Sequence, residues 1–413
     1  MLYLSNGLLI LLFFLIASCE EKMSNELENE TAIKLGEWRM QMKMQSKVLP
    51  YNFLYELEDS NPIIKIKNGN EEIVVNDIVR INDSLIVKMP VFESVFYLKV
   101  VDENLLEGNW VNYYKGSDYK IPVRAQYGKK ERFEKPFKIL AIEGKYEVTF
   151  GGNTEDEFKA IGLFSANDSA QLGTFATETG DYRHLEGVVT EDSLFLSTFD
   201  GSHAFLFEAK IKGDTLDGVF LSGSHYKVSW SAFPNELATL KNADSLTFIK
   251  EGYDAFAFRF PDQNGDTLSL EDERFANKAV IVQIMGSWCP NCLDETNYYK
   301  TLYDQYQKEG LEIVALAFER TKTEERAYAN LKRLLEKTEA NYPFLLAGAT
   351  RETKASEALP MLNHIMSYPT SIFLDRKHEI KRIHTGFYGP STGEYYTRFV
   401  KNTEALVEEM LKD

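Results

Sequence analysis

Two cysteines, Cys289 and Cys292, stand three positions apart in the segment Met-Gly-Ser-Trp-Cys-Pro-Asn-Cys that ends at residue 292. This spacing is typical of a redox pair that alternates between dithiol and disulfide, of half a metal site, or of a structural disulfide. A disulfide between residues this close closes a very small loop and stabilises the folded chain little. A tetrahedral zinc site needs four ligands, and His364, His378 and His384 show no paired spacing that would complete one. The pair therefore favours reversible thiol–disulfide exchange.

The residues around the pair predict a buried strand that leads directly into a helix. Residues 278–288 are nearly all apolar, as expected of a central strand covered on both faces. Residues 290–310 repeat apolar side chains at helical spacing and end in Gly310, which favours a helix stop. The predicted buried face of this helix carries Cys292, Tyr299, Leu302, Tyr303 and Tyr306.

This placement predicts that the first cysteine is the reactive one. Cys289 is expected at the N-cap, with Pro290 at the first helical position, where the missing N–H of proline costs nothing. The unpaired N–H groups and the positive dipole end of the helix would stabilise a thiolate on Cys289. The thiolate is the form that attacks disulfides, and Cys292, about one turn further on, would lie close enough to resolve the mixed disulfide.

The region from residue 255 to the end predicts an α/β sheet that carries the cysteine pair at its first strand–helix junction. A hairpin is expected first, with its turn at Asn264-Gly265. Apolar runs and helical patterns then alternate in the order β-α-β-α-β-β-α. After the first strand and helix, the predicted elements are strand 311–319, helix 321–340, strands 342–348, 368–375 and 378–387, and helix 394–413.

Several motifs in this region match one known family. They are Trp288-Cys289-Pro290-Asn291-Cys292, Lys278 with the apolar run after it, Glu295, Tyr368-Pro369-Thr370 and Gly386. On these motifs, residues 255–413 resemble the thioredoxin-fold domain of the TlpA/ResA group of membrane-tethered thiol-disulfide oxidoreductases. The resemblance implies that Cys289 attacks a substrate disulfide and that Cys292 resolves the mixed disulfide. It implies no cofactor and no metal.

The resemblance also implies roles for residues beside the cysteines. Glu295 occupies the position of an acidic residue near the buried thiol, where it would act as a general base; the alternative is a first-turn carboxylate favoured by the helix dipole. Pro369 would be a cis-proline, and the backbone of Tyr368 would bind substrate. Trp288 would pack against and shield the site. Gln283 stands where many relatives carry Asp or Asn, which shifts any proton relay towards Glu295.

Residues 36–240 predict an all-β domain, a sandwich or barrel built of two repeats, which a linker (residues 241–254) joins to the C-terminal domain. Short alternating runs recur between Gly, Asn and Asp residues, and the pattern returns with an offset near 109 residues. Gly36-Glu-Trp returns as Gly144-Lys-Tyr, and Asp83-Ser-Leu as Asp192-Ser-Leu. A basic link at residues 127–138 joins the copies. The domain would bind a partner or small ligand, or act as a spacer. His184, His203 and His225 lack the spacing of metal ligands.

The first 35 residues predict export and attachment to a membrane surface. Residues 1–18 read as a signal peptide whose apolar core is too short to span a bilayer. The run Ile-Ala-Ser-Cys ending at Cys19 resembles a bacterial lipoprotein cleavage box, which implies a lipid on Cys19; the alternative is an ordinary signal peptide. Residues 19–35 are polar and acidic, as in a solvated tether. The expected location is the cell envelope, on the periplasmic side of a membrane.

The charge of the chain excludes one class of partner and leaves the substrate open. The net charge of −17 and the pI near 5.0 argue against binding nucleic acid. The leading hypothesis is a lipid-anchored reductase of envelope proteins that contain disulfides, recharged by a membrane thiol donor. Two alternatives stay open: a thiol peroxidase of the peroxiredoxin branch, and a β-domain binding lipoprotein whose thioredoxin-like module senses redox state.

Overall fold

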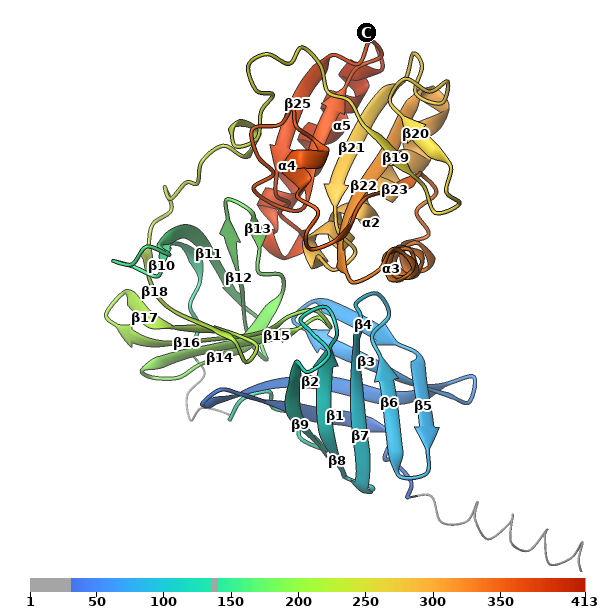
Figure 1. Cartoon of the computed structure of the whole chain (residues 1–413). Helices are drawn as coiled ribbons and strands as arrows, with labels where there is room; N and C mark the ends of the chain where they lie inside the picture. The colour runs from blue at the N-terminus through green and yellow to red at the C-terminus, as the bar shows by residue number, and fades with distance from the viewer. Residues whose placement is uncertain (1–30, 135–139, 413) are drawn as a thin grey trace, which may run out of the picture.

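The computed structural model describes residues 31–134 and 140–412. The expected signal peptide, Cys19 and most of the predicted tether lie outside the described residues. Figure 1 shows two β units below an α/β unit that contains the cysteine pair. Among the described residues, no helix has the length and apolar character needed to cross a bilayer.

The first β unit is a nine-stranded antiparallel sheet with the order β4-β3-β2-β1-β9-β8-β7-β6-β5. Its strands are β1 (Gly36–Met44), β2 (Lys47–Glu58), β3 (Asn61–Asn68), β4 (Glu71–Val75), β5 (Asp77–Ile81), β6 (Ser84–Lys88), β7 (Ser94–Asp102), β8 (Leu105–Asn112) and β9 (Lys120–Tyr127). Alternate side chains of β1, from Trp38 to Met44, point into its core, as the period of two in a strand requires.

The second β unit has nine strands and closes on itself, because β11 pairs with β12 as well as with β10. Its strands are β10 (Gly144–Phe150), β11 (Phe158–Ala166), β12 (Gln171–Thr177), β13 (Gly180–Asp181), β14 (Leu185–Val189), β15 (Ser193–Phe199), β16 (Ala204–Lys212), β17 (Thr215–Ser222) and β18 (Tyr226–Pro234). The prediction of an all-β region built of two barrel-like repeats is confirmed.

The two β units correspond strand by strand. β1 and β10 each pair with the next strand and with the last strand of their own unit. Gly108 in β8 and Gly218 in β17 take equivalent positions, where a Cβ would lie 1.9 Å and 2.0 Å from a carbonyl oxygen of the neighbouring strand. Both repeats therefore need a glycine at this position, where the neighbouring strand comes closest.

Replacing Gly218 with alanine is expected to destabilise the protein by about 2 kcal/mol, because the added Cβ displaces the backbone of β16. The measurement is the free energy of unfolding from urea titration. Gly152→Ala is the matched control, since its Cβ would meet only Thr149 Cγ2 at 3.7 Å. Equal losses in the two variants would contradict the close-approach argument.

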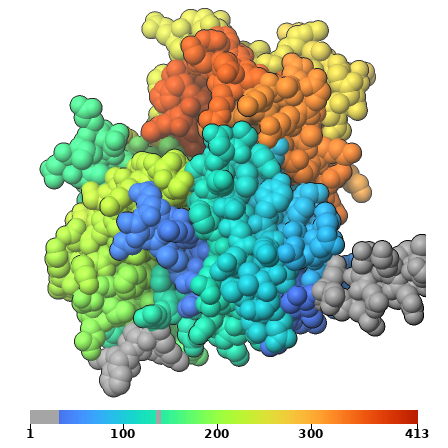
Figure 2. Space-filling view, turned by 60° about the horizontal axis from the view of Figure 1, so that its bottom comes forward, coloured from blue at the N-terminus to red at the C-terminus, as the bar shows by residue number. Residues whose placement is uncertain are grey.

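The apolar core of the first β unit extends into the second unit, which also has a core of its own. Phe199 of the second unit stacks on Tyr51 with ring centroids 4.9 Å apart and meets Trp110 edge-on at 5.2 Å. Figure 2 shows the two units in direct contact along their length. The units therefore form one continuous body.

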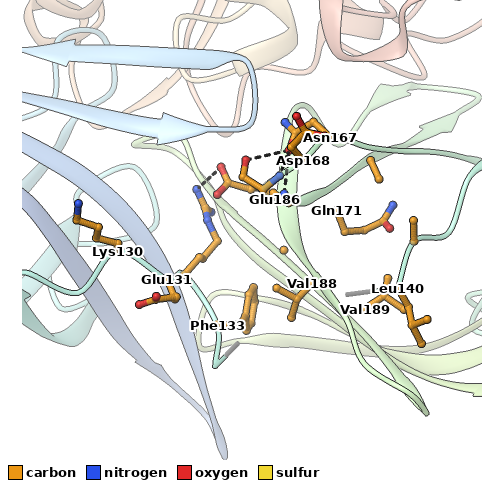
Figure 3. A pocket seen from close by; sticks show the side chains of 16 residues that line it. Lys130, Glu131, Phe133, Leu140, Asn167, Asp168, Gln171, Glu186, Val188 and Val189 are labelled. Carbon is orange, nitrogen blue, oxygen red and sulfur yellow. Dashed lines mark hydrogen bonds and ion pairs between the residues drawn. The ribbon is translucent and has the colours of Figure 1, made fainter. Parts of the chain in front are cut away.

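The predicted basic link between the repeats also helps to join them. Arg132 is buried and donates to the carbonyl oxygen of Ser197 at 3.1 Å and to the Glu186 carboxylate at 3.2 Å. Figure 3 shows the adjoining pocket, with Phe133, Gln171 and Glu186 on its wall. Arg132 of the link therefore contacts the second β unit directly.

The α/β unit has the predicted order of elements around a five-stranded sheet, β23-β22-β21-β24-β25. The strands of this sheet are β21 (Ala279–Met285), β22 (Leu311–Thr321), β23 (Phe344–Thr350), β24 (Thr370–Leu374) and β25 (Ile380–Thr385). The α/β unit also contains the strands β19 (Arg259–Pro261) and β20 (Thr267–Ser269), which pair with each other. Its helices are α2 (Pro290–Tyr306), α3 (Glu324–Thr338), α4 (Ala355–Ala358) and α5 (Glu394–Met410), and the short 3-10 turns are η1 (Ala243–Ser245), η2 (Gln307–Glu309) and η3 (Pro390–Thr392).

The central strand β21 is buried on both faces, as predicted. Its odd-numbered apolar residues pack against α2, α3 and α5, and its even-numbered ones pack against residues 256–275 and 359–362. Predicted linker residues lie against the α/β unit: the Asp244 carboxylate meets His384 Nδ1 at 2.6 Å, and Thr385 Oγ1 lies 2.8 Å from Thr247 Oγ1.

Candidate active site

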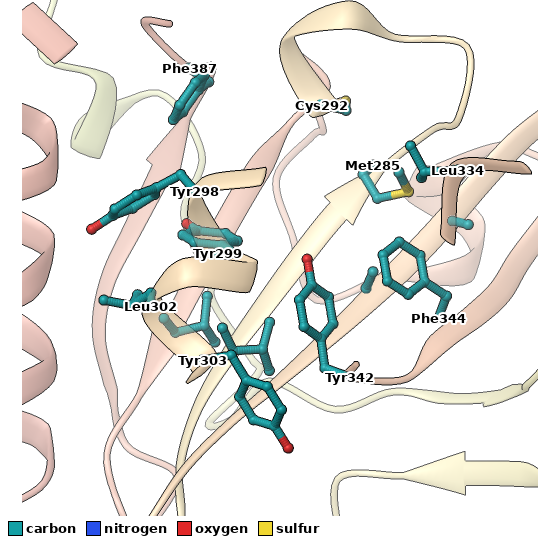
Figure 4. Packing of buried hydrophobic residues seen from close by; sticks show 14 of the residues in the cluster. Met285, Cys292, Tyr298, Tyr299, Leu302, Tyr303, Leu334, Tyr342, Phe344 and Phe387 are labelled. Carbon is teal, nitrogen blue, oxygen red and sulfur yellow. The ribbon is translucent and has the colours of Figure 1, made fainter. Parts of the chain in front are cut away.

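The cysteine pair lies where β21 ends and α2 begins. Cys289 is the N-cap residue, with an extended backbone (φ −101°, ψ 114°), and Pro290 opens the helix. The Cys289 sulfur accepts a hydrogen bond from the Cys292 N–H at 3.3 Å. Both residues are free thiols, 7% and 0% exposed. Figure 4 shows Cys292 at the edge of an apolar cluster that includes Met285 and Tyr299.

The predicted cis-proline loop lies beside the first cysteine. The Tyr368–Pro369 peptide bond is cis, and Tyr368 O accepts a hydrogen bond from Cys289 Sγ at 3.3 Å. The N–H of Gly386 donates to Pro369 O at 2.8 Å, and Gly386 has a φ of +80°, which favours glycine. A loop about 80 positions downstream in sequence therefore meets Cys289, and Gly386 in turn bonds that loop.

Glu295 is a fully buried carboxylate on the inner side of α2. It accepts hydrogen bonds from Gln283 Nε2 at 2.9 Å and from Ser371 Oγ at 3.0 Å. Burial raises the pKa of Glu295 to about 7, and these hydrogen bonds only partly oppose the shift. Both hydrogen bonds come from strands of the sheet, Gln283 in β21 and Ser371 in β24. Ser371 was not predicted, because nothing near Glu295 in sequence points to it.

The second thiol is harder to ionise than an ordinary cysteine. Burial raises the pKa of Cys292 well above its usual value, and the neighbouring Cys289 and the charge of Glu295 raise it further. Resolution of a mixed disulfide by Cys292 therefore needs a nearby proton acceptor. Glu295 has a pKa near neutrality and interacts electrostatically with this thiol.

Trp288 packs within a cluster of aromatic and cationic side chains. Its ring stacks on Tyr114 of the first β unit with centroids 5.2 Å apart, and the Arg320 guanidinium carbon lies 3.8 Å from its ring centroid. Its indole N–H donates to Phe318 O at 2.9 Å. The residue before it, Ser287, donates through both its N–H and its hydroxyl to the buried Glu319 carboxylate at 2.7 Å.

The largest departure from the sequence analysis is that the β units supply residues to this site. Arg183, on the second β unit, donates to the Pro290 carbonyl between the two cysteines at 3.1 Å. It also pairs with Asp294 in α2, with Glu71 in the first β unit and with Asp200. No pattern in the sequence links position 183 to position 290, so local signals could not identify it.

The described residues hold no arrangement of three or more His, Cys, Asp or Glu side chains suited to a metal ion. The site brings together Trp288, Cys289, Cys292, Glu295, Tyr368 and Pro369. The predicted lipidation site, Cys19, lies outside the described residues.

Comparisons with known proteins show what the C-terminal region is similar to. A family model described as Redoxin matches residues 250–396. The thiol-disulfide oxidoreductase ResA of Halalkalibacterium halodurans is 22% identical over 155 residues, which cover 38% of this chain and 80% of that protein. ResA of Bacillus subtilis is 25% identical over 156 residues, which cover 38% and 79%.

Among solved structures, a thiol:disulfide interchange protein of the thioredoxin family from Chlorobium tepidum matches 38% of this chain and 94% of its own, with 20% identity and a TM-score of 0.30. A thiol-disulfide oxidoreductase from Bacteroides fragilis matches 36% and 99%, with 17% identity and a TM-score of 0.28. On its family match, its motifs and its sheet order, the C-terminal region is a redoxin domain with the thioredoxin fold, related to the ResA thiol-disulfide oxidoreductases.

Proposed function

We propose that the protein is a membrane-tethered thiol-disulfide oxidoreductase that reduces disulfides in proteins of the cell envelope. The observation that carries the proposal is the placement of Cys289 at the N-cap of α2, 3.3 Å from Tyr368 O in the cis-proline loop, with the buried Cys292 behind it. This arrangement suits a division of roles, with Cys289 as the attacking thiol and the more deeply buried Cys292 as the resolving thiol.

The reaction begins when the Cys289 thiolate attacks one sulfur of the substrate disulfide. The substrate disulfide breaks, a mixed disulfide forms on Cys289, and the other substrate sulfur leaves as a thiolate. Cys292 then passes its proton to Glu295 and attacks the Cys289 sulfur, which releases the second substrate thiolate. The substrate has gained two electrons, and the protein holds a Cys289–Cys292 disulfide that a membrane thiol donor reduces again.

Attachment to the membrane rests on the sequence before the first β unit. The Ile-Ala-Ser-Cys run ending at Cys19 supports lipidation of that cysteine, and residues 19–35 would serve as the tether. The anchored protein would meet its substrates and its donor on the periplasmic side.

The proposal predicts that the reduced protein reduces insulin disulfides and that its two thiols titrate as one two-electron couple. The measurements are insulin reduction in the presence of a dithiol donor, and the fraction of intramolecular disulfide across a series of glutathione redox buffers. Activity should follow the reduced fraction of the Cys289–Cys292 pair. A protein that reduces no insulin, or whose cysteines oxidise independently of each other, would contradict the proposed function.

A further inference from the structure

The β units cover the three residues that flank and separate the cysteines. Ser202 Oγ donates to Trp288 O at 3.1 Å, and Arg183 donates to Pro290 O at 3.1 Å. Asn291 Nδ2 donates to Asp181 O at 3.3 Å. Cys289, which lies among these contacted residues, is 7% exposed.

The turn between β12 and β13 also covers the cis-proline side of the site. Ser367 Oγ donates to Thr179 O at 2.7 Å. A Cβ on Gly386 would lie 2.8 Å from the Thr179 carbonyl carbon, so the two backbones touch. The Asp181 carboxylate accepts a hydrogen bond from the Gly389 N–H at 2.5 Å. We call Tyr114, Thr179–Asp181, Arg183 and Ser202 the covering surface.

A disulfide cannot react with Cys289 while the covering surface is in place. Thiol–disulfide exchange needs the entering sulfur to approach the Cys289 sulfur directly, through an intermediate in which both chains are bonded there. A protein substrate brings backbone and side chains with its disulfide, and the covering surface already occupies that space.

We propose that the β units and the redoxin domain separate to expose Cys289, and that the docked arrangement is a closed state in which the covering surface occupies the place of the substrate. This inference rests on the proposed role of Cys289 as the attacking thiol. The closed state lowers the apparent affinity for a substrate by the fraction of molecules that are open.

The connection between the units suits such a movement. The chain passes from β18 to η1 through residues 235–242, and Leu237 in this segment is 86% exposed. From η1 onwards the chain already lies against the redoxin domain through Asp244 and Thr247. The apolar core of the first β unit extends into the second unit, so the two would move together on this single connection.

The docked interface combines ion pairs with apolar contacts, which involve residues 91–92 of the first β unit and residues 388–395 of the redoxin domain. Arg183 lies at its centre, where it pairs with Asp294 of the redoxin domain and with Glu71 and Asp200 of the β units. At the periphery, Glu93 of the first β unit pairs with Arg326 of α3 at 2.6 Å. Loss of Arg183 would leave three acidic side chains facing one another across the interface, which favours opening.

The test measures the alkylation rate of Cys289 by N-ethylmaleimide in the reduced full chain, resolved by peptide mass spectrometry. Wild-type Cys289 should react slowly relative to the same chain in urea. Arg183→Ala and Glu93→Lys should each react about tenfold faster than wild type, because each raises the open population. Lys212→Glu, which breaks an exposed ion pair with Asp217 on the second β unit, should react at the wild-type rate.

A second, independent variant makes this test decisive. Glu93→Lys acts through Arg326 and leaves Arg183 intact, so it tests the interface even if Arg183→Ala fails to fold.

The two proposals fail in different ways. Rapid alkylation of wild-type Cys289, or unchanged rates in a folded Glu93→Lys variant, would overturn the closed state and leave the oxidoreductase activity standing. Slow alkylation that both variants relieve, with no disulfide reduction by the wild type or by either opened variant, would support the closed state and overturn the proposed function.

Discussion

A Cys292→Ser variant is expected to attack a disulfide once and then to hold the substrate as a stable mixed disulfide on Cys289. Cys292 is fully buried in α2, and its backbone N–H already bonds the Cys289 sulfur at 3.3 Å, so it is the thiol positioned to release the substrate. A serine hydroxyl cannot form the protein disulfide that completes this step. Insulin reduction under multiple-turnover conditions should fall at least about 1000-fold, because a resolving nucleophile is absent.

The measurement is a single mixing of the reduced variant with a protein that contains one disulfide, followed by intact mass spectrometry. One equivalent of substrate should remain bound and should be released by dithiothreitol. From cell extracts, the same variant would capture the natural substrate for identification.

Cys289→Ser is the matched control for this prediction. The remaining thiol, Cys292, is 0% exposed and burial raises its pKa well above the usual value, so it should attack no disulfide. This variant should form no mixed disulfide and should show no insulin reduction. Equal trapping by the two variants would contradict the assignment of separate attacking and resolving thiols.

The redox pair and the strand and helix that hold it were predictable from sequence, because the patterns that indicate them are local. The apolar run of β21, the proline after Cys289 and the helical spacing of α2 lie within one continuous segment. The start of α3 also has a local cause, because the Thr323 hydroxyl accepts a hydrogen bond from the Arg326 N–H at 3.4 Å. Each feature depends only on residues a few positions apart.

The strands of the repeats were harder to identify, because their pairing is not local. The segment of β2 was not predicted, and it contains Pro50, a residue that is rare within strands. The pairing of β2 explains why it can contain a proline. β3 pairs with β2 only from Asn52 onwards, so no neighbouring strand on that side needs the missing N–H of Pro50. Closure of the second unit through β11 and β12 likewise depends on strand register, which no short motif records.

The covering surface was beyond sequence analysis for the same reason. Tyr114 and Arg183 lie more than a hundred positions before Trp288 and Asp294, in loops whose composition is ordinary for turns. Their effect on the cysteine pair comes from the docking of whole units. In the full chain, the β units contact the residues on both sides of Cys289.

A Glu295→Gln variant is expected to be more stable than the wild type at pH 8 and slower in the resolving step. The folded-state pKa of Glu295 is about 7, above its ordinary value of 4.5, so the folded protein binds this proton more tightly than the unfolded chain. The contribution to stability is therefore full below pH 4.5 and is lost as the pH rises from 4.5 to 7. A glutamine stays neutral, so it should raise the free energy of unfolding at pH 8 by about 2 kcal/mol and flatten this part of the pH profile.

The hydrogen bonds of Glu295 should survive this change. A glutamine carbonyl can accept from Gln283 Nε2, and its amide can donate to the Ser371 hydroxyl, which changes from donor to acceptor in that contact. A loss of activity in Glu295→Gln would then be caused by the missing proton acceptor and not by a disrupted site structure.

Without that acceptor, deprotonation of Cys292 should slow and the mixed disulfide should decay about 100-fold more slowly at pH 7. Urea titrations between pH 4 and pH 8 measure the stability, and the decay of a preformed mixed disulfide measures the resolving step. Asp304→Asn removes an exposed carboxylate from the other end of α2 and should change neither quantity appreciably. A Glu295→Gln protein that gains stability but resolves at the wild-type rate would exclude Glu295 as the proton acceptor, because stability and proton transfer would then be separate properties of this buried carboxylate.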